Sequence, residues 1–411
     1  MESILAAFTV CLTLAFLFSE LFYRLRYPKV VGQILAGVVL GLPFIRVYFE
    51  ETFISFVESL ADLGVVFLLL LVGTEVRIEE LKKVSRKGLL LALLGYSIPL
   101  TMGYTLMTIL GYSSLTSVIV GICLAITATA ITVEILIEYD LLNTDLGFLI
   151  MDTGIIDDFF AVFSLALVIG TVQGDGFETL RTLPGEFLTF IIMAYIIGFT
   201  ILPKAAKMVW KEKSEAAVFS LAIIFGLLIV LLSNSFGLSS VLGAFVAGVI
   251  IQLSIKNKRE EKEIVESLQI VTFGLIIPFF FIFVGLNFSI VHLFDNIGLI
   301  ILLAGVALVG KILAANIYGA INNVGRIHAQ LIGWGINSRG AVELIIATIA
   351  LENNLISTTI FQAIVAMAVI ASIISPMMFR RTLRKERESG SAIKKEHKRH
   401  VKRNVHAKIK K

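Results

Sequence analysis

Apolar runs of about twenty residues, separated by short polar segments, recur along almost the whole chain. A helix of that length crosses the hydrocarbon core of a bilayer. A β-barrel would instead show strands of about ten residues with alternating polarity. The pattern therefore predicts an all-α polytopic membrane protein with about thirteen transmembrane helices. The predicted spans are 3–23, 28–41, 56–74, 88–110, 115–137, 146–171, 186–203, 214–232, 238–255, 265–286, 297–318, 329–351 and 357–379.

Composition agrees with this class. Of the 411 residues, 57% are hydrophobic and only 16% are charged, whereas a soluble domain carries about 25% charged residues. The two cysteines, Cys11 and Cys123, both fall inside apolar segments. That placement argues against a disulfide scaffold or a thiolate metal cluster.

Basic residues predict the orientation. With thirteen spans, one set of alternate loops holds seventeen lysines and arginines, and the opposite set holds only Arg46 and Arg181. The positive-inside rule makes the first set cytoplasmic and places the N-terminus outside. The strongly basic tail, 381–411, is then cytoplasmic as well. We expect it to be solvated or to contact anionic membrane lipid, and we expect no nucleic-acid partner.

An internal repeat is visible in the glycine pattern. The segment "VGQILAGVVLG" (31–41) aligns with "LGAFVAGVIIQ" (242–252) at an offset of 211 residues, and Gly73 aligns with Gly285 at an offset of 212. Each match moves seven spans along, and seven is odd, so the copies face opposite ways. Inverted repeats are typical of secondary transporters, which bind substrate between broken helices at the midplane. The predicted domain is 1–380, with repeats at about 1–171 and 214–379 and a linker helix at about 186–203.

Two spans are expected to be discontinuous helices. The fifth contains "AITATAITVEIL" (125–136), in which Thr127, Thr129 and Thr132 compete for backbone hydrogen bonds. At the repeat offset lies "GWGINSRGAVELI" (333–345), which is rich in glycine. If the breaks cross, positive and negative helix ends face one another there, and buried charges could neutralise them.

Carboxylates interrupt the apolar sixth span. In "GIIDDFFAV", Asp157 and Asp158 are adjacent, so their side chains point about 100° apart on a helix. Charges within spans mark a functional site by default. One aspartate could face a cation pathway while the other pairs with Lys311, a lone amine in the eleventh span. A purely structural ion pair between Asp157 and Lys311 is the alternative.

Arg339 has two possible roles. It could neutralise the helix ends at the crossing, or it could pair with Asp152, Glu134 or Glu343. Because Glu343 follows by four residues, a local pair on one helix is the simplest of these. Asp152 could be a third pathway carboxylate or the counter-ion of Arg339.

These motifs resemble a known family. "GIIDDFFAV", "TATAIT", the "GK" that contains Lys311 and "SRGAVELIIA" look like the monovalent cation:proton antiporter superfamily. Within it, the adjacent aspartates resemble the electrogenic bacterial sodium/proton antiporters. The resemblance covers about residues 1–380.

The resemblance implies roles for the site residues. Asp158 would bind either a sodium ion or a proton, and Asp157 would pair with Lys311 in a pair that opens during the cycle. Thr129 would lend polar atoms or backbone at the crossing. A homodimer is also implied.

One residue departs from the pattern. The best-known bacterial member has an aspartate directly after the crossing threonine, where this chain has Ala130. Arg339 with an acidic partner would then compensate the crossing, as in the electroneutral branch.

The sequence thus predicts a transporter, not an enzyme: a sodium/proton antiporter working by alternating access, with Na⁺ and H⁺ as substrates and no cofactor. An electrogenic cycle is favoured because Lys311 offers a second proton carrier.

The main alternative is a potassium/proton antiporter or potassium efflux system, although such efflux proteins usually carry a glutamine–aspartate pair and a nucleotide-binding domain. An intramembrane aspartyl protease needs carboxylates that share a proton, which adjacent residues on one helix cannot do. A passive channel fits the inverted repeat less well.

Overall fold

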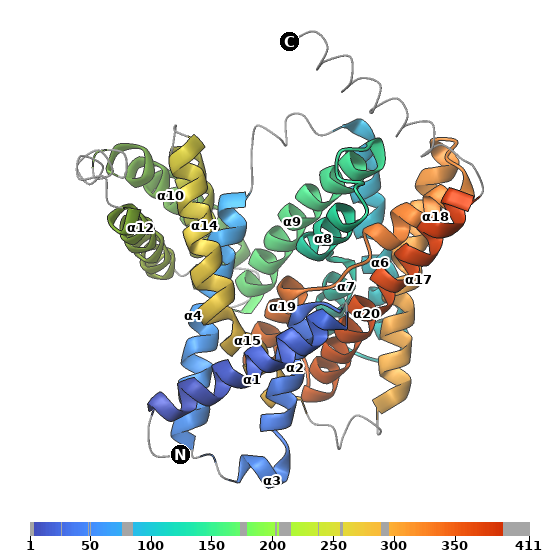
Figure 1. Cartoon of the computed structure of the whole chain (residues 1–411). Coiled ribbons are helices and arrows are strands. Elements are labelled where there is room, and N and C mark those ends of the chain that lie inside the picture. The colour runs from blue at the N-terminus through green and yellow to red at the C-terminus, as the bar shows by residue number, and fades with distance from the viewer. Residues whose placement is uncertain are drawn as a thin grey trace, which may run out of the picture. The chain divides into compact units, whose positions relative to one another are not determined.

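A computed structural model gives the fold (Figure 1). The structure describes residues 4–25, 27–47, 49, 51–75, 85–172, 179–201, 204, 215–236, 238–254, 258–288 and 296–388, some of them by backbone alone. These residues fall into two compact units, which we describe separately. Unit 1 comprises 1–80, 162–295 and 348–354, and unit 2 comprises 81–161, 296–347 and 355–411.

Every regular element in the described ranges is helical. Unit 1 contains α1 (Ile4–Arg24), α2 (Lys29–Leu40), α3 (Pro43–Arg46), α4 (Glu51–Glu75), α10 (Thr179–Ile196), the π-helical turn η2 (Ile197–Ile201), α12 (Glu215–Ser235), α13 (Ser240–Ser254), α14 (Lys258–Val271), the π-helical turn η3 (Thr272–Ile276) and α15 (Ile277–Leu286). Unit 2 contains α6 (Arg86–Ile109), α7 (Ser114–Ala125), α8 (Thr129–Glu138), α17 (Ile297–Ile321), α18 (Arg326–Gly335) and α20 (Thr358–Glu388). Two helices begin in unit 2 and end in unit 1, namely α9 (Asp145–Val172) and α19 (Ala341–Glu352).

Six helical segments in the described ranges are long and apolar enough to cross a membrane by themselves. Further apolar helices are shorter, among them α2, α7 and α13. This confirms the all-α membrane class. The number of thirteen crossings stays a prediction, as do the domain and repeat boundaries. The six long segments are Ile4–Arg24, Thr52–Thr74, Arg86–Ile109, Glu263–Leu286, Ile297–Ile321 and Thr358–Glu388.

Glycines allow two close helix crossings inside unit 1. A Cβ on Gly73 of α4 would lie 2.9 Å from the Cα of Gly248 on α13, and a Cβ on Gly285 of α15 would lie 2.8 Å from the Cα of Gly37 on α2. Small residues at such contacts let helix backbones approach in a membrane. The repeat offset aligns Gly37 with Gly248 and Gly73 with Gly285, so each contact joins one member of each aligned pair. A repeat of this offset would produce such reciprocal contacts.

Unit 2 has its own apolar core, to which the broken helices contribute. In it, α6 packs on α7 and α17, and α17 packs on α18 and α20. Buried side chains from several of these helices form one cluster, which includes Leu91, Ile150, Tyr318, Ile332 and Phe379. This core fixes the helices that carry the charged residues.

The last helix continues beyond the predicted end of the final span, while the boundary of the membrane domain at 380 stays a prediction. The sequence pattern ended the final span at 379 and began a tail at 381, but α20 continues to Glu388. Thr382, Leu383 and Glu386 are buried, because residues at this spacing share one helix face. Glu386 also bonds Nδ1 of His328 on α18 at 2.6 Å. Residues 389–411 lie outside the described ranges.

Candidate functional site

Two interrupted helices meet in unit 2, as the sequence predicted. Helix α7 ends at Ala125 and α8 begins at Thr129, while α18 ends at Gly335 and α19 begins at Ala341. The unwound stretches, 126–128 and 336–340, contact one another, since the Ala128 N–H donates to the Ser338 carbonyl at 2.8 Å. Backbone groups freed inside a membrane must find partners within the protein, and here each stretch supplies some for the other.

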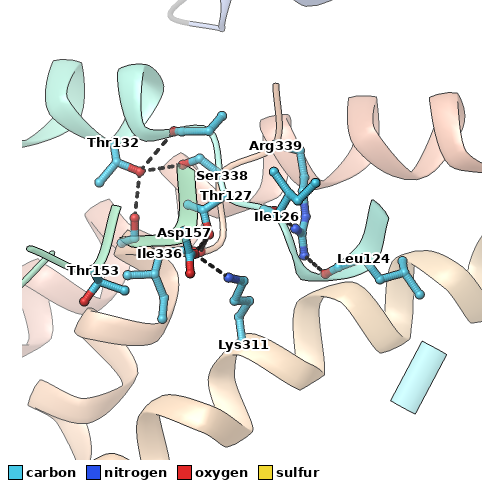
Figure 2. A network of polar contacts seen from close by, with 12 residues as sticks. Leu124, Ile126, Thr127, Thr132, Thr153, Asp157, Lys311, Ile336, Ser338 and Arg339 are labelled. Carbon is cyan, nitrogen blue, oxygen red and sulfur yellow. Dashed lines mark hydrogen bonds and ion pairs between the residues drawn. The ribbon is translucent and has the colours of Figure 1, made fainter. Parts of the chain in front are cut away.

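The predicted ion pair between Asp157 and Lys311 is present (Figure 2). Nζ of Lys311 on α17 lies 2.9 Å from Oδ2 of Asp157 on α9, and both side chains are fully buried. Among the described residues, the other carboxylate oxygen, Oδ1, has no hydrogen-bond partner. An uncompensated charge in this position would be costly, so each member of the pair makes the other tolerable.

Thr127 links this pair to the crossing. Its Oγ1 lies 2.6 Å from Oδ2 of Asp157 and 2.9 Å from the carbonyl oxygen of Ile336. A hydroxyl has a single hydrogen to donate. Thr127 therefore serves either the carboxylate or the backbone carbonyl at a given moment, and it connects the two.

Thr132, like Thr127, bonds a carbonyl at the end of α18. Its hydroxyl donates to the Gly335 carbonyl at 2.8 Å and lies 3.3 Å from Oγ of Ser338 (Figure 2). Carbonyls in the last turn of a helix have no partner within that helix. Thr127 in the first stretch and Thr132 on α8 thus bond the carbonyls that end α18.

Arg339 caps the end of α7. Its guanidinium donates to the carbonyl oxygen of Leu124 at 2.6 Å and to that of Ile126 (Figure 2). A cation at the C-terminus of a helix opposes the negative end of the helix dipole. This contact corresponds to the first of the two roles left open by the sequence, and a pair with Glu134 stays untested because that side chain lies outside the described part of the structure.

Glu343 caps the start of α19. Its Oε1 accepts the N–H of Gly340, the reciprocal half of a capping box, in which an acid at the third helical position bonds the capping residue. The side chains of Arg339 and Glu343, both within the described residues, form no ion pair with each other. The local pair expected from their spacing is therefore wrong, because each side chain is committed to a different helix end.

Asp152 does not support the crossing in this structure. Its Oδ2 accepts from the backbone N–H of Ser85 at 3.0 Å and from the Ser85 hydroxyl at 2.8 Å, at the start of α6. It also lines a cavity of about 710 Å³ in unit 2, together with Tyr318, His328 and Glu386. Neither Asp157 nor Lys311 lines that cavity.

Three of the predicted side chains cannot be placed. The backbone puts Asp158 on α9 beside Asp157 and puts Thr129 at the first residue of α8. Their side chains, and that of Glu134, lie outside the described part of the structure. The roles assigned to Asp158 and Thr129 remain predictions.

The sequence did not reveal two residues of α20. Oγ of Ser372 donates to the Arg339 carbonyl at 2.8 Å, and Oγ of Ser375 donates to the Asn337 carbonyl at 2.9 Å. The only signal was a pair of serines three residues apart in an apolar span. Such serines usually bond their own helix, so the pattern did not point to the crossing.

Comparison with known proteins agrees with the fold. Residues 9–385 match the family described as "Sodium/hydrogen exchanger, transmembrane". The chain is 27% identical to a Na(+)/H(+) antiporter of Enterococcus hirae over 88% of this chain and 93% of that protein. It is 25% identical to the Na(+)/H(+)-K(+) antiporter GerN of Bacillus cereus, over 88% of this chain and 92% of that one.

A solved structure shares the fold. The sodium proton antiporter MjNhaP1 of Methanocaldococcus jannaschii superposes with a TM-score of 0.70 at 17% identity, covering 92% of this chain and 97% of that one. The family match extends over nearly the whole chain. The chain belongs to the sodium/hydrogen exchanger family of membrane transport proteins.

Proposed function

We propose that this protein exchanges Na⁺ for H⁺ by alternating access, with Asp157 and Asp158 of α9 as its cation and proton site. The observation that carries this proposal is the fully buried pair of Asp157 and Lys311 beside two interrupted helices. In transporters, discontinuous helices at the midplane form the ion site.

Competition for a buried carboxylate explains the exchange. A lone ionised carboxylate away from water is costly, so it favours either a bound proton or a bound cation. Sodium is a hard ion that suits carboxylate, hydroxyl and carbonyl oxygens. Asp158 is proposed to alternate between the two substrates while Asp157 remains tied to Lys311 for part of the cycle. If the protein changes sides only with the site occupied, one substrate drives the other.

We propose an electrogenic cycle. When the pair of Asp157 and Lys311 opens, Lys311 can carry a proton in addition to the one on Asp158. Two protons for one sodium ion move one net charge per cycle. The fully buried position of Lys311 supports this role, since a cation there depends on the pair for its tolerance.

Proteoliposomes test both parts of the proposal. Purified protein is reconstituted with a pH-sensitive dye inside, and Na⁺ or K⁺ is added outside with or without an imposed membrane potential. We expect Na⁺-dependent proton flux that responds to the potential. Asp158→Asn should abolish the flux, and Asp145→Asn, in the first turn of the same helix, should retain it. Flux in Asp158→Asn would refute the site, and flux that ignores the potential would refute electrogenicity.

Potassium/proton exchange is the second candidate. GerN, which resembles this chain over most of its length, is named for both Na⁺ and K⁺. The same assay decides between the cations: proton flux driven by K⁺ at concentrations where Na⁺ is ineffective would favour this alternative.

Orientation and assembly are part of the proposal. The asymmetry of basic residues supports an N-terminus outside and a C-terminus in the cytoplasm. Family resemblance supports a homodimer.

A further inference from the structure

Two serines of α20 hold the unwound stretch of the second interruption. Ser375 donates to the carbonyl of Asn337 and Ser372 donates to that of Arg339. Between them, the Ser338 carbonyl accepts the N–H of Ala128 instead. Successive carbonyls therefore alternate sides, as in an extended strand, with α20 bonding one side and the first interruption bonding the other.

Several helical serines and threonines of the chain bond a carbonyl of their own helix. Ser59, Thr101 and Thr108 each donate to a carbonyl four residues earlier, which is the ordinary behaviour of such hydroxyls. The hydroxyls of Ser372 and Ser375 instead bond residues 33 and 38 positions away, and both serines are buried, with exposures of 5% and 0%.

A proline interrupts the hydrogen bonding of α20 at this point. Pro376 lies inside the helix directly after Ser375. It has no N–H to donate to the carbonyl of the residue four positions earlier, Ser372, and its ring crowds that carbonyl. The helix is thus interrupted in its hydrogen bonding where the two serines face the unwound stretch.

A third contact restrains the same stretch from another helix. Nδ2 of Asn337 donates to the carbonyl of Leu308 on α17 at 3.0 Å, and Leu308 lies three residues before Lys311. With its backbone held by α20 and its side chain by α17, the stretch presents Arg339 toward the carbonyls that end α7.

We propose that Ser372 and Ser375 are positioning residues for cation transport. They fix the carbonyl directions of 337 and 339, and so they set where Arg339 and Ser338 point beside the pair of Asp157 and Lys311. They themselves need not touch the cation. This inference rests on the proposed ion site, and it adds α20 to the elements that define that site.

Matched substitutions separate the hydroxyl from side-chain shape. Thr and Val have nearly the same volume, so Ser372→Thr/Ser375→Thr and Ser372→Val/Ser375→Val differ chiefly in two hydroxyls. Thr382→Val is a control at a buried position of the same helix, for which the described residues give no bond to the stretch. Each full-length variant is reconstituted, and the half-saturating cation concentration and the maximal exchange rate are measured separately. Hydrogen–deuterium exchange of peptides covering 336–341 is measured on the same preparations.

We expect the Val pair to raise the half-saturating concentration by about fivefold per lost hydroxyl and to speed deuterium uptake in the stretch. The Thr pair and Thr382→Val should stay near wild type in both measurements. Should the double Val variant fail to fold, the single Val variants give the same comparison. The inference is overturned by unchanged deuterium uptake in the Val variants, or by faster uptake with an unchanged half-saturating concentration.

A failure of the proposed function looks different. The wild-type protein would then show no cation-dependent proton flux, or the Asp158→Asn variant would retain that flux. Deuterium uptake in the Val variants reports on the serines whether or not that happens.

Discussion

The two helix interruptions in unit 2 face the same physical problem with different chemistry. Each unwinds inside the membrane and frees carbonyls and N–H groups that need partners. The first, at 126–128, is short and uncharged, with Thr127 inside it and Thr132 just beyond. The second, at 336–340, contains Arg339 and is followed by Glu343. At the repeat offset of 211, Arg339 aligns with Ala128 and Glu343 aligns with Thr132.

Compensation is exchanged between the two interruptions. The threonines of the first bond the carbonyls that end α18, and the guanidinium of the second bonds the carbonyls that end α7. Each interruption thus relies in part on groups of the other. The chain thus has two breaks and concentrates the fixed charges in one of them. The uncharged break is the one that connects with Asp157.

Removal of the Arg339 charge should have the largest effect on this exchange. Arg339→Met leaves the carbonyls at the end of α7 without their donor and leaves Glu343 buried without a nearby cation. Breaking buried charge compensation costs about 3–5 kcal/mol. We expect a large fall in unfolding temperature in detergent and no exchange activity. Arg339→Lys keeps the charge without the planar guanidinium. Its unfolding temperature and exchange activity should lie between those of the wild type and of Arg339→Met. A Met variant as stable as wild type would mean that α7 does not depend on the second interruption.

The ion pair can be separated from the crossing by a double-mutant cycle. Asp157→Asn and Lys311→Met should each abolish exchange, and each should destabilise the fold by roughly 2–3 kcal/mol because one partner stays buried. The double variant should be more stable than the sum of the two losses predicts, by about 1–3 kcal/mol. Simple additivity in thermal unfolding would show that the two groups are not energetically coupled.

Loss of the threonine hydroxyls should have a moderate effect. Thr132→Val strands the Gly335 carbonyl, and Thr127→Val strands the Ile336 carbonyl and removes one bond to Asp157, each costing about 1–3 kcal/mol. Thr→Ser at either position should be close to wild type. Thr127→Val should impair exchange more than Thr132→Val, since only Thr127 contacts the carboxylate. Equal impairment in flux assays would argue against a special link through Thr127.

Neutralisation of Glu343 should have the smallest effect. In Glu343→Gln an amide oxygen can still accept the Gly340 N–H. The variant loses the interaction of the charge with the start of α19 and the attraction of that charge to the nearby Arg339. The first of these is worth about 0.3–1 kcal/mol near the surface and up to about 2 kcal/mol when partly buried. Near-normal unfolding temperature and measurable exchange are expected. A loss as large as that of Arg339→Met would show that the acid, and not only its oxygen, is required.

Much of the fold could be predicted from apolar length and from breaking residues. The spans follow from runs long enough to cross a bilayer, and both interruptions follow from threonine and glycine in segments that would otherwise be helical. The pairing of Asp157 with Lys311 could be predicted because a lone lysine in an apolar span requires a partner. The extension of α20 to Glu388 was not predicted, because most residues after 379 are charged. The buried positions among them, Thr382, Leu383 and Glu386, are too few and too polar to form an apolar pattern.

The details of the crossing could not be predicted from residue types. Whether Arg339 bonds Glu343 or the end of α7 depends on where backbone carbonyls point, and spacing along one helix says nothing about that. The same limit hid Ser372 and Ser375, whose acceptors lie on another segment. Asp152 was predicted to lie at the site because it is close to Asp157 in the sequence, but its carboxylate contacts Ser85.

The burial of both cysteines has a practical consequence. Cys11 and Cys123 are the only thiols in the chain, and both are unpaired and inaccessible. A cysteine introduced at an exposed site is then the sole thiol open to a water-soluble maleimide in the native protein. Leu25 and Ser114 are exposed, lie between predicted spans and fall on opposite sides of the membrane in the predicted orientation. Whole-cell labelling of Ser114→Cys, with Leu25→Cys reacting only after lysis, would read out the topology without prior removal of native cysteines.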